Sequence, residues 1–447
     1  MKRFVALLLA AAMLTLSSCG RTPPGAVEKA PDEKQPAVIR PHGEGEALEH
    51  NSPPAQEGME GPELLENGHA SLEADSYYGR SLLEGEEREL YERLVLAAEE
   101  CRNFIEVGDL SVNREQFAKV FQYMVLDHPQ FFYLSKAYQF RYYQNQPDRP
   151  VVIILNYFDG RVTDEIAGDY SFARQADRAV IAQQRARMER AVRDYLEVIP
   201  EGLPDFEKER LAHDRVLACA GYDSAAAASV TQPGADSHAF TAYGALVGGM
   251  AVCEGYSEAF QYLLYRMGVN CLLVIGESQN QPHQWNLVCI DGEYYHVDPT
   301  WDDTDLFDDL GMTCYYYFNM SDQRILRDHT IGLAAGQEGG YGYPLPEAGS
   351  EEGYYYSEMA LEIGADGMLP LDTRRKVEAA VERGDPYLML LFDPSWSGEQ
   401  VKSWINATVW EWEGELPEAL RRCGAQLDTA YYSVSRWSMA LVPILGS

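Results

Sequence analysis

The stretch MAVCEGYSEAF, residues 250–260, places one cysteine at the point where a loop gives way to a helix. Gly248 and Gly249 precede it, and the apolar residues that follow, from Ala259 to Leu264, recur at helical spacing. Such a cysteine has two interpretations. Free cysteine is one of the most often buried residue types, so Cys253 could simply fill a core. At a helix N-terminus, where unpaired N–H groups favour negative charge, it could instead be a nucleophile.

A thiol nucleophile needs a base, and two histidines follow on a predicted hairpin. The stretches HQWNLVCI (283–290) and EYYHVD (293–298) have the composition of strands. Asp291-Gly292 between them is a strong signal for a two-residue turn. A further strand is predicted just before them, in NCLLVIGE (270–277). The cysteine helix is thus followed by an antiparallel sheet that carries the histidines.

A two-residue turn in this hairpin places Asp298 opposite Trp285. Asp298 then lies diagonal to His283 on the same face of the sheet, about 7–8 Å away, which side chains of this length can span. A carboxylate there can hold one ring nitrogen of His283 and leave the other for the thiol of Cys253. A turn longer or shorter by one residue would put Asp298 on the opposite face. The triad is therefore conditional on the register.

Other polar and aromatic residues nearby have simpler interpretations. His296 shares the predicted face with His283 and is the alternative base, but it lies farther along its strand, and we expect a core histidine. Tyr243 could donate to an oxyanion, although the Cys253 backbone N–H is the more natural donor. The remaining residues are expected to be solvated or capping (Asp302, Asp303), to pack the hairpin or screen the site from water (Trp285, Trp301), or to lie on the surface (His213-Asp214).

Charge and cysteine content limit the possible partners. The 447-residue chain has a formal net charge of −34, which repels phosphates and argues against nucleic acid or an anionic membrane surface as a docking partner. Seven cysteines follow Cys19, an odd number, so at least one is unpaired within the chain. They are too dispersed for a disulfide scaffold and lack metal-ligand spacing. We therefore expect mostly buried thiols, with no metal and no cofactor.

Residues 1–19 have the organisation of a secretion signal. Lys2 and Arg3 form a basic start, and the apolar stretch from Phe4 to Leu14 is too short to span a bilayer, which takes about 20 residues. A transmembrane anchor is the alternative. The ending LSSC resembles the lipobox of bacterial lipoproteins, which implies cleavage before Cys19 and lipid on its sulfur. The mature protein would then be anchored to the cell membrane on its extracytoplasmic face.

Composition divides the rest of the chain into four parts. Residues 20–76, rich in Pro, Glu and Gly, predict a disordered acidic tether. Residues 77–204 predict a mainly helical domain with a small sheet. Residues 205–335 hold Cys253 and the hairpin, and within them 239–269 predicts two helices, the second opening at Cys253. Residues 336–447 predict a connector and a small α/β unit in the order helix, strand, helix, strand.

Three stretches together carry a family resemblance: GGMAVCEGYSEAF, PHQWNLVCIDGEYYHVDPTWDD and YYYFNMSDQRILRDHT. They resemble the transglutaminase-like superfamily, in particular its bacterial exported members with a helical N-terminal domain. The match covers roughly residues 205–330, and a cysteine followed in order by HxWN, a DG hairpin and HVDPTWDD is highly specific. The resemblance implies an α+β fold with a papain/transglutaminase-like core. It also implies that Cys253 is the nucleophile, His283 the base and Asp298 the orienting acid.

The resemblance further implies a thiol enzyme that acts on protein or peptide amides through a thioester. Water as the acceptor would make it a peptidase or amidase, and an amine would make it a transglutaminase. The expected location points to extracellular or cell-wall substrates. Some relatives require calcium, but no acidic loop here has the ligand spacing that predicts it. The alternative is an inactive surface binding module with the same fold, although all three catalytic residue types are present in order.

Overall fold

The computed structural model describes residues 43–47, 76–143, 145–160, 174–229, 237–304, 307, 312–332, 342–393, 395–409, 414–427, 431–432 and 439–446. The chain divides into two compact units: a larger one up to Thr304 and from Thr313 to Gly353, and a smaller one from Tyr354 onward with Phe307 and Met312. The predicted signal sequence, Cys19 and most of the predicted tether lie outside the described residues. Within the described residues, no helix is long and apolar enough to cross a bilayer.

The larger unit begins with helices and a small mixed sheet. The helices are α1 (Tyr78–Ser81), α2 (Gly85–Glu99) and α3 (Arg114–Asp127), and the sheet has the order β1-β3-β4-β2, with strands β1 (Gly43–Ala47), β2 (Phe104–Glu106), β3 (Leu134–Tyr142) and β4 (Pro150–Tyr157). A capping box between Asn113 and Gln116 starts α3. Its apolar face meets the sheet where Phe117 and Phe121 pack on Tyr138.

Strand β1 departs from the predicted tether. Gly43–Ala47 pairs in parallel with β3, from Gly43 opposite Tyr138 to Ala47 opposite Tyr142. The prediction of disorder rested on the scarcity of apolar side chains in residues 20–76. An edge strand, however, is held by backbone hydrogen bonds, which require no particular side chain.

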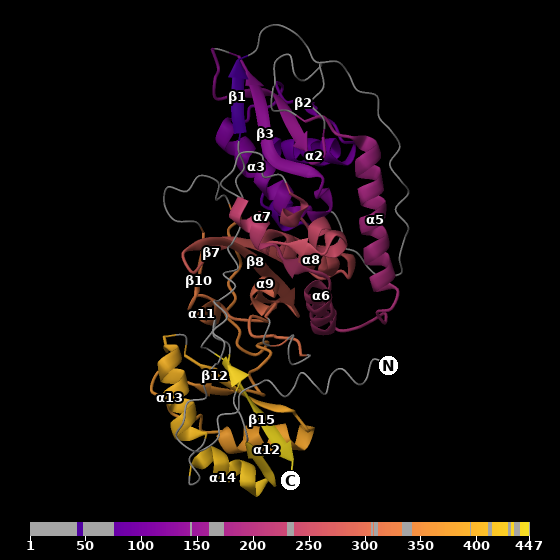
Figure 1. Ribbon diagram of the computed structural model, residues 1–447. Coiled ribbons are helices and arrows are strands. Elements are labelled where there is room, and N and C mark those ends of the chain that lie inside the picture. The colour runs from indigo at the N-terminus through magenta and orange to yellow at the C-terminus, as the bar shows by residue number, and fades with distance from the viewer. Residues whose placement is uncertain are drawn as a thin grey trace. The chain divides into compact units, whose positions relative to one another are not determined.

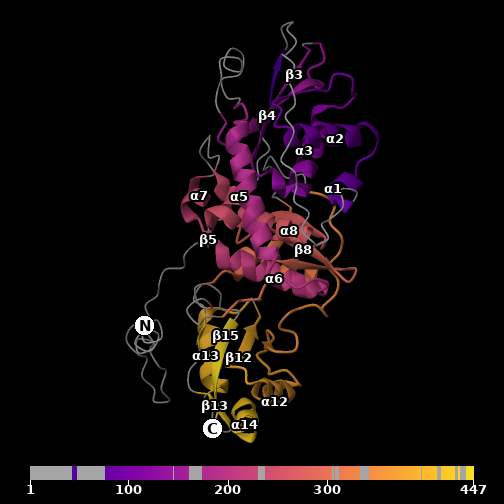
Figure 2. The same ribbon diagram turned by 90° about the vertical axis from the view of Figure 1, so that its right-hand side faces the viewer.

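The central part of the larger unit surrounds one buried helix. It comprises α5 (Arg178–Leu196), α6 (Asp205–Cys219), β5 (Gly221–Tyr222), α7 (Ser224–Ser229), the 3₁₀ helix η4 (His238–Phe240), the π-helical turn η5 (Gly244–Gly248), β6 (Met250–Ala251) and α8 (Cys253–Arg266). In Figure 2, α5 runs lengthwise from beside β4 to α6. Figure 1 shows α8 against β8 with α6 beside it. Helix α8 is buried on nearly all sides, as its run of apolar and aromatic residues requires.

The segment before α8 is less helical than predicted. In place of one continuous helix, η4 and η5 form two short turns, and Thr241 between them is extended. A Cβ atom at Gly244 would lie 2.0 Å from the carbonyl oxygen of His238, so the close approach of these turns requires glycine. Gly249 ends η5 in the left-handed conformation, with φ 75°. The second predicted helix does open at Cys253, as expected.

A four-stranded antiparallel sheet of order β10-β7-β8-β9 packs on α8. Its strands are β7 (Cys271–Ser278), β8 (Gln281–Ile290), β9 (Glu293–Val297) and β10 (His329–Ile331). Ile290 pairs with Glu293, and Asp291 and Gly292 both have positive φ, 51° and 89°. The two-residue turn and the register inferred from it are confirmed, because Asn286 lies opposite Val297. Asp298 therefore follows β9 on the predicted face and starts the short helix α9 (Pro299–Asp302).

The smaller unit has its own sheet and core. Its elements are β11 (Leu361–Ile363), α12 (Thr373–Arg383), β12 (Tyr387–Phe392), α13 (Gly398–Thr408), α14 (Glu415–Arg422), β13 (Ala425–Leu427), β14 (Tyr431–Tyr432) and β15 (Met439–Gly446). They include the predicted helix, strand and helix, but the last predicted strand, at 430–445, is replaced by two strands, β14 and β15, which pair in antiparallel orientation. Leu390 of β12, Val377 of α12 and Val401 of α13 meet in its apolar core.

Candidate active site

Cys253 is the first residue of α8. Its N-cap residue, Val252, is extended and supplies no side-chain hydrogen bond to the first turn. The N–H groups of that turn and the helix dipole favour negative charge on the Cys253 sulfur or on an oxygen bound beside it. A Cβ atom at Gly255 would lie 2.6 Å from the carbonyl oxygen of Ala239. Glycine is therefore needed where this helix end presses against the neighbouring backbone.

Cys253 has no exposed surface. It packs in an apolar cluster with Ala226, Ala227, Ala239, Phe240 and Val252, and Tyr222 packs against the same cluster while remaining partly exposed. The cover comes mainly from small side chains of α7 and η4. This cover separates the sulfur from solvent.

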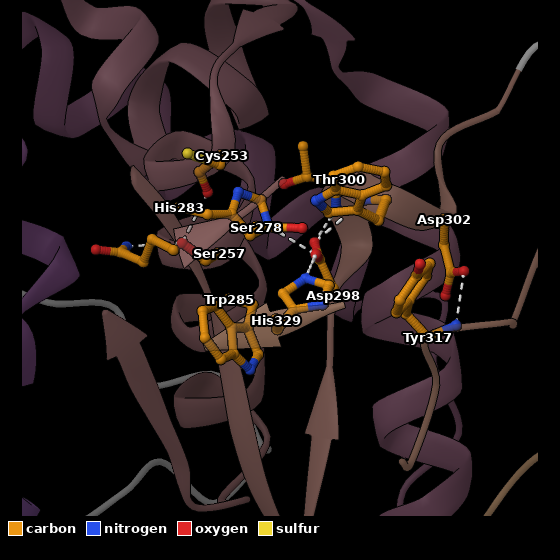
Figure 3. A network of polar contacts seen from close by, with 12 residues as sticks. Cys253, Ser257, Ser278, His283, Trp285, Asp298, Thr300, Asp302, Tyr317 and His329 are labelled. Atoms are coloured by element: carbon orange, nitrogen blue, oxygen red, sulfur yellow. Dashed lines mark hydrogen bonds and ion pairs between the residues drawn. The ribbon is translucent and has the colours of Figure 1, made fainter. Parts of the chain in front are cut away.

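His283 of β8 lies between Cys253 and Asp298 (Figure 3). Its Nε2 atom is 2.7 Å from Oδ2 of Asp298, which leaves Nδ1 for its hydrogen bond with Cys253. Burial disfavours the imidazolium, but the Asp298 charge, its hydrogen bond and the interaction with Cys253 outweigh burial and raise the pKa of His283 to about 9. At neutral pH the ring is therefore positively charged beside the sulfur.

Asp298 is fully buried, and each of its carboxylate oxygens has two nitrogen partners. Oδ1 accepts the backbone N–H groups of Thr300 and Trp301 at 3.0 and 3.1 Å, so Asp298 caps α9. Oδ2 lies 2.7 Å from Nε2 of His283 and 3.2 Å from Nε2 of His329. Burial alone would raise the pKa of this carboxyl, but the two histidines hold it well below its usual range. Asp298 is therefore ionised inside the fold.

His329 was not identified from the sequence. It opens β10, which pairs with β7 at the sheet edge, with His329 opposite Ser278. This pairing brings together residues far apart in the chain, and the three-residue strand HTI carries no hairpin signal of its own. The Asp328-His329 pair lies just before the last residue of one of the stretches quoted for the family resemblance, which was the only available signal.

His296, the alternative base, takes no part in the contact with Cys253. Its Nδ1 atom accepts the indole N–H of Trp285 at 3.0 Å, and its Nε2 atom is 2.8 Å from Oδ1 of Asp322. Burial lowers the pKa of His296 despite Asp322. The expectation of a satisfied core histidine is confirmed.

Two expectations about polar residues were wrong. His213, expected on the surface, is fully buried, with Nε2 3.2 Å from Oδ2 of Asp302. Asp302, expected to be solvated or capping, is also buried, and its Oδ1 accepts the backbone N–H of Tyr317 at 2.9 Å. The reason lies in the tertiary structure: α6 packs against α9, so His213 and Asp302 are buried between these helices, which the sequence alone does not reveal. Asp303 accepts the Tyr256 hydroxyl at 2.6 Å.

Two aromatic residues singled out in the sequence, Trp285 and Tyr243, pack against neighbouring side chains. Trp285 is fully buried, and Tyr243 stacks on Phe132 with ring centroids 4.8 Å apart. Tyr222 is a neighbour that sequence reasoning missed. Its pKa is raised first by burial and then by the charges of Cys253 and Asp298, so its hydroxyl is neutral. It is partly exposed and packs against the cysteine cluster described above.

Three donor atoms of the site are close enough together for a metal ion. They belong to His283, Asp298 and His329 and lie within 4.8 Å of one another. Each already has a hydrogen-bonding partner within the group, and His329 has a second carboxylate partner, Asp328. Hydrogen bonding thus accounts for the arrangement, and we assign no metal to it.

The comparisons with known proteins agree with this geometry. Residues 196–299 match the family model of the transglutaminase-like superfamily. The chain carries a transglutaminase-like domain. Cys253, His283 and Asp298 all lie within these residues: Cys253 at the start of α8, His283 on β8 and Asp298 directly after β9. Cys19 lies outside the described residues.

No curated protein matches the chain. Among solved structures, similarity is found to "Crystal structure of a TGase", with 15% identity over 38% of this chain and a TM-score of 0.24. A second, "Putative Cysteine Protease from Cytophaga hutchinsonii", has 14% identity over 26% of this chain and a TM-score of 0.20. The chain spans 53% and 38% of the lengths of these two proteins. Likenesses at this level carry no weight in the functional argument.

Proposed function

We propose that the protein is a thiol enzyme that acts on protein or peptide amides through a thioester on Cys253. The observation that carries this proposal is the His283 ring, hydrogen-bonded to ionised Asp298 through Nε2 and to Cys253 through the other side of the ring. The transglutaminase-like domain that contains these residues supports a cysteine enzyme in general. The more specific mechanism follows from the chemistry of the side chains.

In the first half-reaction, the proton shared by the pair already lies on His283, and the Cys253 sulfur attacks the carbonyl carbon of the amide. Negative charge develops on the carbonyl oxygen, where first-turn N–H groups of α8, including that of Cys253, can stabilise it. The His283 imidazolium then donates its proton to the leaving nitrogen as the C–N bond breaks. The acyl group remains as a thioester on Cys253, and an amine leaves.

In the second half-reaction, water or an amine attacks the thioester carbonyl. His283 takes the proton of the attacking group and keeps it, and the Cys253 sulfur leaves with the electrons of the C–S bond, which restores the starting pair. Asp298 keeps its charge throughout, orients the ring and stabilises its positive form. The product is an acid if water attacks and a new amide if an amine attacks.

We propose, in addition, that the enzyme acts outside the cytoplasm on extracellular or cell-wall substrates. The residues that support this lie in the leader: the basic start, the short apolar stretch and LSSC ending at Cys19. A lipid on Cys19, followed by a long acidic segment, would keep the domain near the membrane while letting it reach proteins around it.

The direct test is turnover by the purified protein. Casein would be incubated with a fluorescent primary amine, and both amine incorporation and peptide release would be measured for the wild type, Cys253→Ala and Cys289→Ala. Cys289 is the matched control, because it lies on β8 near His283 in sequence but belongs to the hairpin end. The proposal predicts that one of the two products forms with the wild type and Cys289→Ala but not with Cys253→Ala. Equal product from all three would show that turnover does not need Cys253 and would contradict the proposal. No product from any, while the folded proteins bind casein, would favour the inactive binding module.

A further inference from the structure

The feature that the proposed mechanism does not use is the second histidine on Asp298. His329 Nε2 lies 3.2 Å from the same Oδ2 atom that His283 contacts at 2.7 Å. All three side chains are buried, and Figure 3 shows His329 on the side of the carboxylate away from Cys253. A buried carboxylate is costly unless its oxygens are paired, and here His329 supplies the last of four nitrogen partners.

His329 is itself held by a carboxylate on its other side. Its Nδ1 atom is 2.6 Å from Oδ1 of Asp328, whose Oδ2 accepts the hydroxyl of Tyr317 at 2.6 Å. Ionised carboxylates only accept hydrogen bonds, so a ring with a carboxylate at each nitrogen must donate from both. His329 is therefore an imidazolium, and the side chains form a row of alternating charge: His283, Asp298, His329, Asp328.

The surroundings fix where this ring can lie. Trp285, Tyr317 and Trp301 surround it, with ring centroids 5.0, 5.4 and 5.9 Å away. Strand β10 can approach β7 only because Gly276 lacks a side chain: a Cβ atom there would lie 2.0 Å from the carbonyl oxygen of Thr330. The sheet edge thus holds the His329 imidazolium beside Oδ2 of Asp298.

We infer that His329 is a positioning residue for the proposed reaction. By donating Nε2–H to Oδ2, it holds the Asp298 carboxylate in the orientation and charge state that fix the His283 ring toward Cys253. It touches neither the sulfur nor a substrate and acts only through Asp298. This inference rests on the proposed function. The competing interpretation is that His329 merely packs the edge of the sheet.

Three variants separate these interpretations. His329→Phe keeps an aromatic ring in the same space but removes both N–H groups. His329→Gln keeps one N–H group at about the position of Nε2. Thr330→Ala is the matched control, because Thr330 is exposed on the same short strand and its side chain is absent from the row of charges. Folding is checked for each by melting temperature and near-UV circular dichroism.

Two quantities are measured at pH 7: the rate constant for alkylation of Cys253 by iodoacetamide, and kcat and KM for casein turnover. The loss of one hydrogen bond between charged groups predicts a fall in both rates on the order of tenfold to a hundredfold in His329→Phe, with KM nearly unchanged. His329→Gln should recover most of this loss, and Thr330→Ala should behave like the wild type.

The outcomes also distinguish the inference from the proposed function. If the wild type is no more active than Cys253→Ala, the proposed function fails and the inference fails with it. If the wild type is active and folded His329→Phe matches it, His329 is a packing residue and only the inference is overturned. If Gln and Phe lose activity equally, the N–H group at Nε2 is not what acts, and the inference is again overturned while the proposed function stands. Should His329→Phe not fold, Asp328→Asn provides the test, because it leaves the ring in place but removes the outer charge. A wild-type rate in Asp328→Asn would then overturn the inference.

Discussion

At the scale of single residues, the site depends on how one buried carboxylate is paired. Asp298 is ionised because His283 and His329 outweigh the cost of its burial, and in return its charge keeps His283 protonated. The ionised state of Asp298 and the protonated state of His283 therefore depend on each other. A change at one residue should therefore be visible in the titration of another, which gives the mechanism a signature beyond loss of activity.

Asp298→Asn should fold but lose turnover by a factor on the order of 10². In a serine triad the comparable change costs about 10⁴, and a thiol, which ionises more easily, should depend less on the acid. The pKa of His283 is raised to about 9, so wild-type turnover should persist up to that pH and fall above it, as the ring loses the proton that the leaving amine needs. Asparagine removes the charge that raises this pKa, while burial, which lowers it, remains.

The alkaline limb of the Asp298→Asn profile should therefore move to lower pH. Turnover measured between pH 5 and 10 for both proteins tests this, with melting temperatures as a control for folding. A limb at the same pH in both proteins would show that Asp298 does not act on His283.

The two hairpin histidines should differ sharply. His283→Ala should abolish turnover, whereas His296→Ala should reduce stability but leave kcat within a few fold, because His296 contacts Trp285 and Asp322 rather than the cysteine. The comparison uses kcat and melting temperature for both variants. If folded His296→Ala lost turnover while His283→Ala retained it, the assignment of His283 as the base would be wrong.

At the scale of elements, the start of α8 is fixed by a buried ion pair from a distant strand. Lys136 of β3 contacts Oε2 of Glu254 at 2.9 Å and Oε1 of Glu258 at 2.8 Å. Glu254 directly follows Cys253. The N-terminal sheet therefore contributes to the position of the nucleophile, and residues 77–204 and the cysteine helix belong to one compact unit.

Lys136→Met should lower the free energy of unfolding by about 3–5 kcal/mol, because it leaves two carboxylates buried without a cation. Lys119→Met is the matched control. Lys119 pairs with Glu87 at 2.6 Å, but its side chain is 34% exposed, so the change should cost about 1 kcal/mol or less. Urea denaturation measures both. Similar losses in the two variants would argue against a special role for the Lys136 contact.

At this scale, the sequence predicted contacts between residues that are close together in the chain and missed contacts between residues that are far apart in it. The hairpin register depends on a local turn, Asp291-Gly292, and it placed Asp298 beside His283 correctly. The contacts of His329 and Lys136 depend on strands and helices that meet only in the folded chain, and neither residue has a sequence signal that names its partner. The predicted helix before Cys253 failed for a similar reason, since Gly244 serves a close approach to His238 that helical periodicity does not reveal.

At the scale of the whole molecule, two features have no role in the proposed chemistry. The smaller unit has a sheet and an apolar core of its own, which the composition of residues 336–447 indicated only as a sequence of elements. The signal sequence and the lipid anchor at Cys19 remain predictions from the sequence. Their proposed role concerns where the enzyme acts and leaves the site itself unchanged.

Cys19→Ala should release the protein from the membrane fraction or leave its signal uncleaved, because lipid attachment and the cleavage it permits both need the thiol. Fractionation of cells with immunodetection and mass determination of the N-terminus measure this. Full membrane retention of a correctly cleaved Cys19→Ala protein would contradict the lipid anchor.

The central claim, that Cys253 is a nucleophile activated by His283, is tested most directly by site-resolved alkylation. Native protein would be treated with iodoacetamide at pH 6, and modification of the seven free cysteines in the described part of the chain would be followed by mass spectrometry. Exposure alone favours Cys219, Cys289 and Cys423, which are only partly buried. Their pKa values are raised by burial, so they should react slowly at this pH. We predict that Cys253 reacts fastest in spite of its cover, and that His283→Ala removes this advantage. Slower modification of Cys253 than of the three more exposed thiols, or the same rate with and without His283, would contradict the claim.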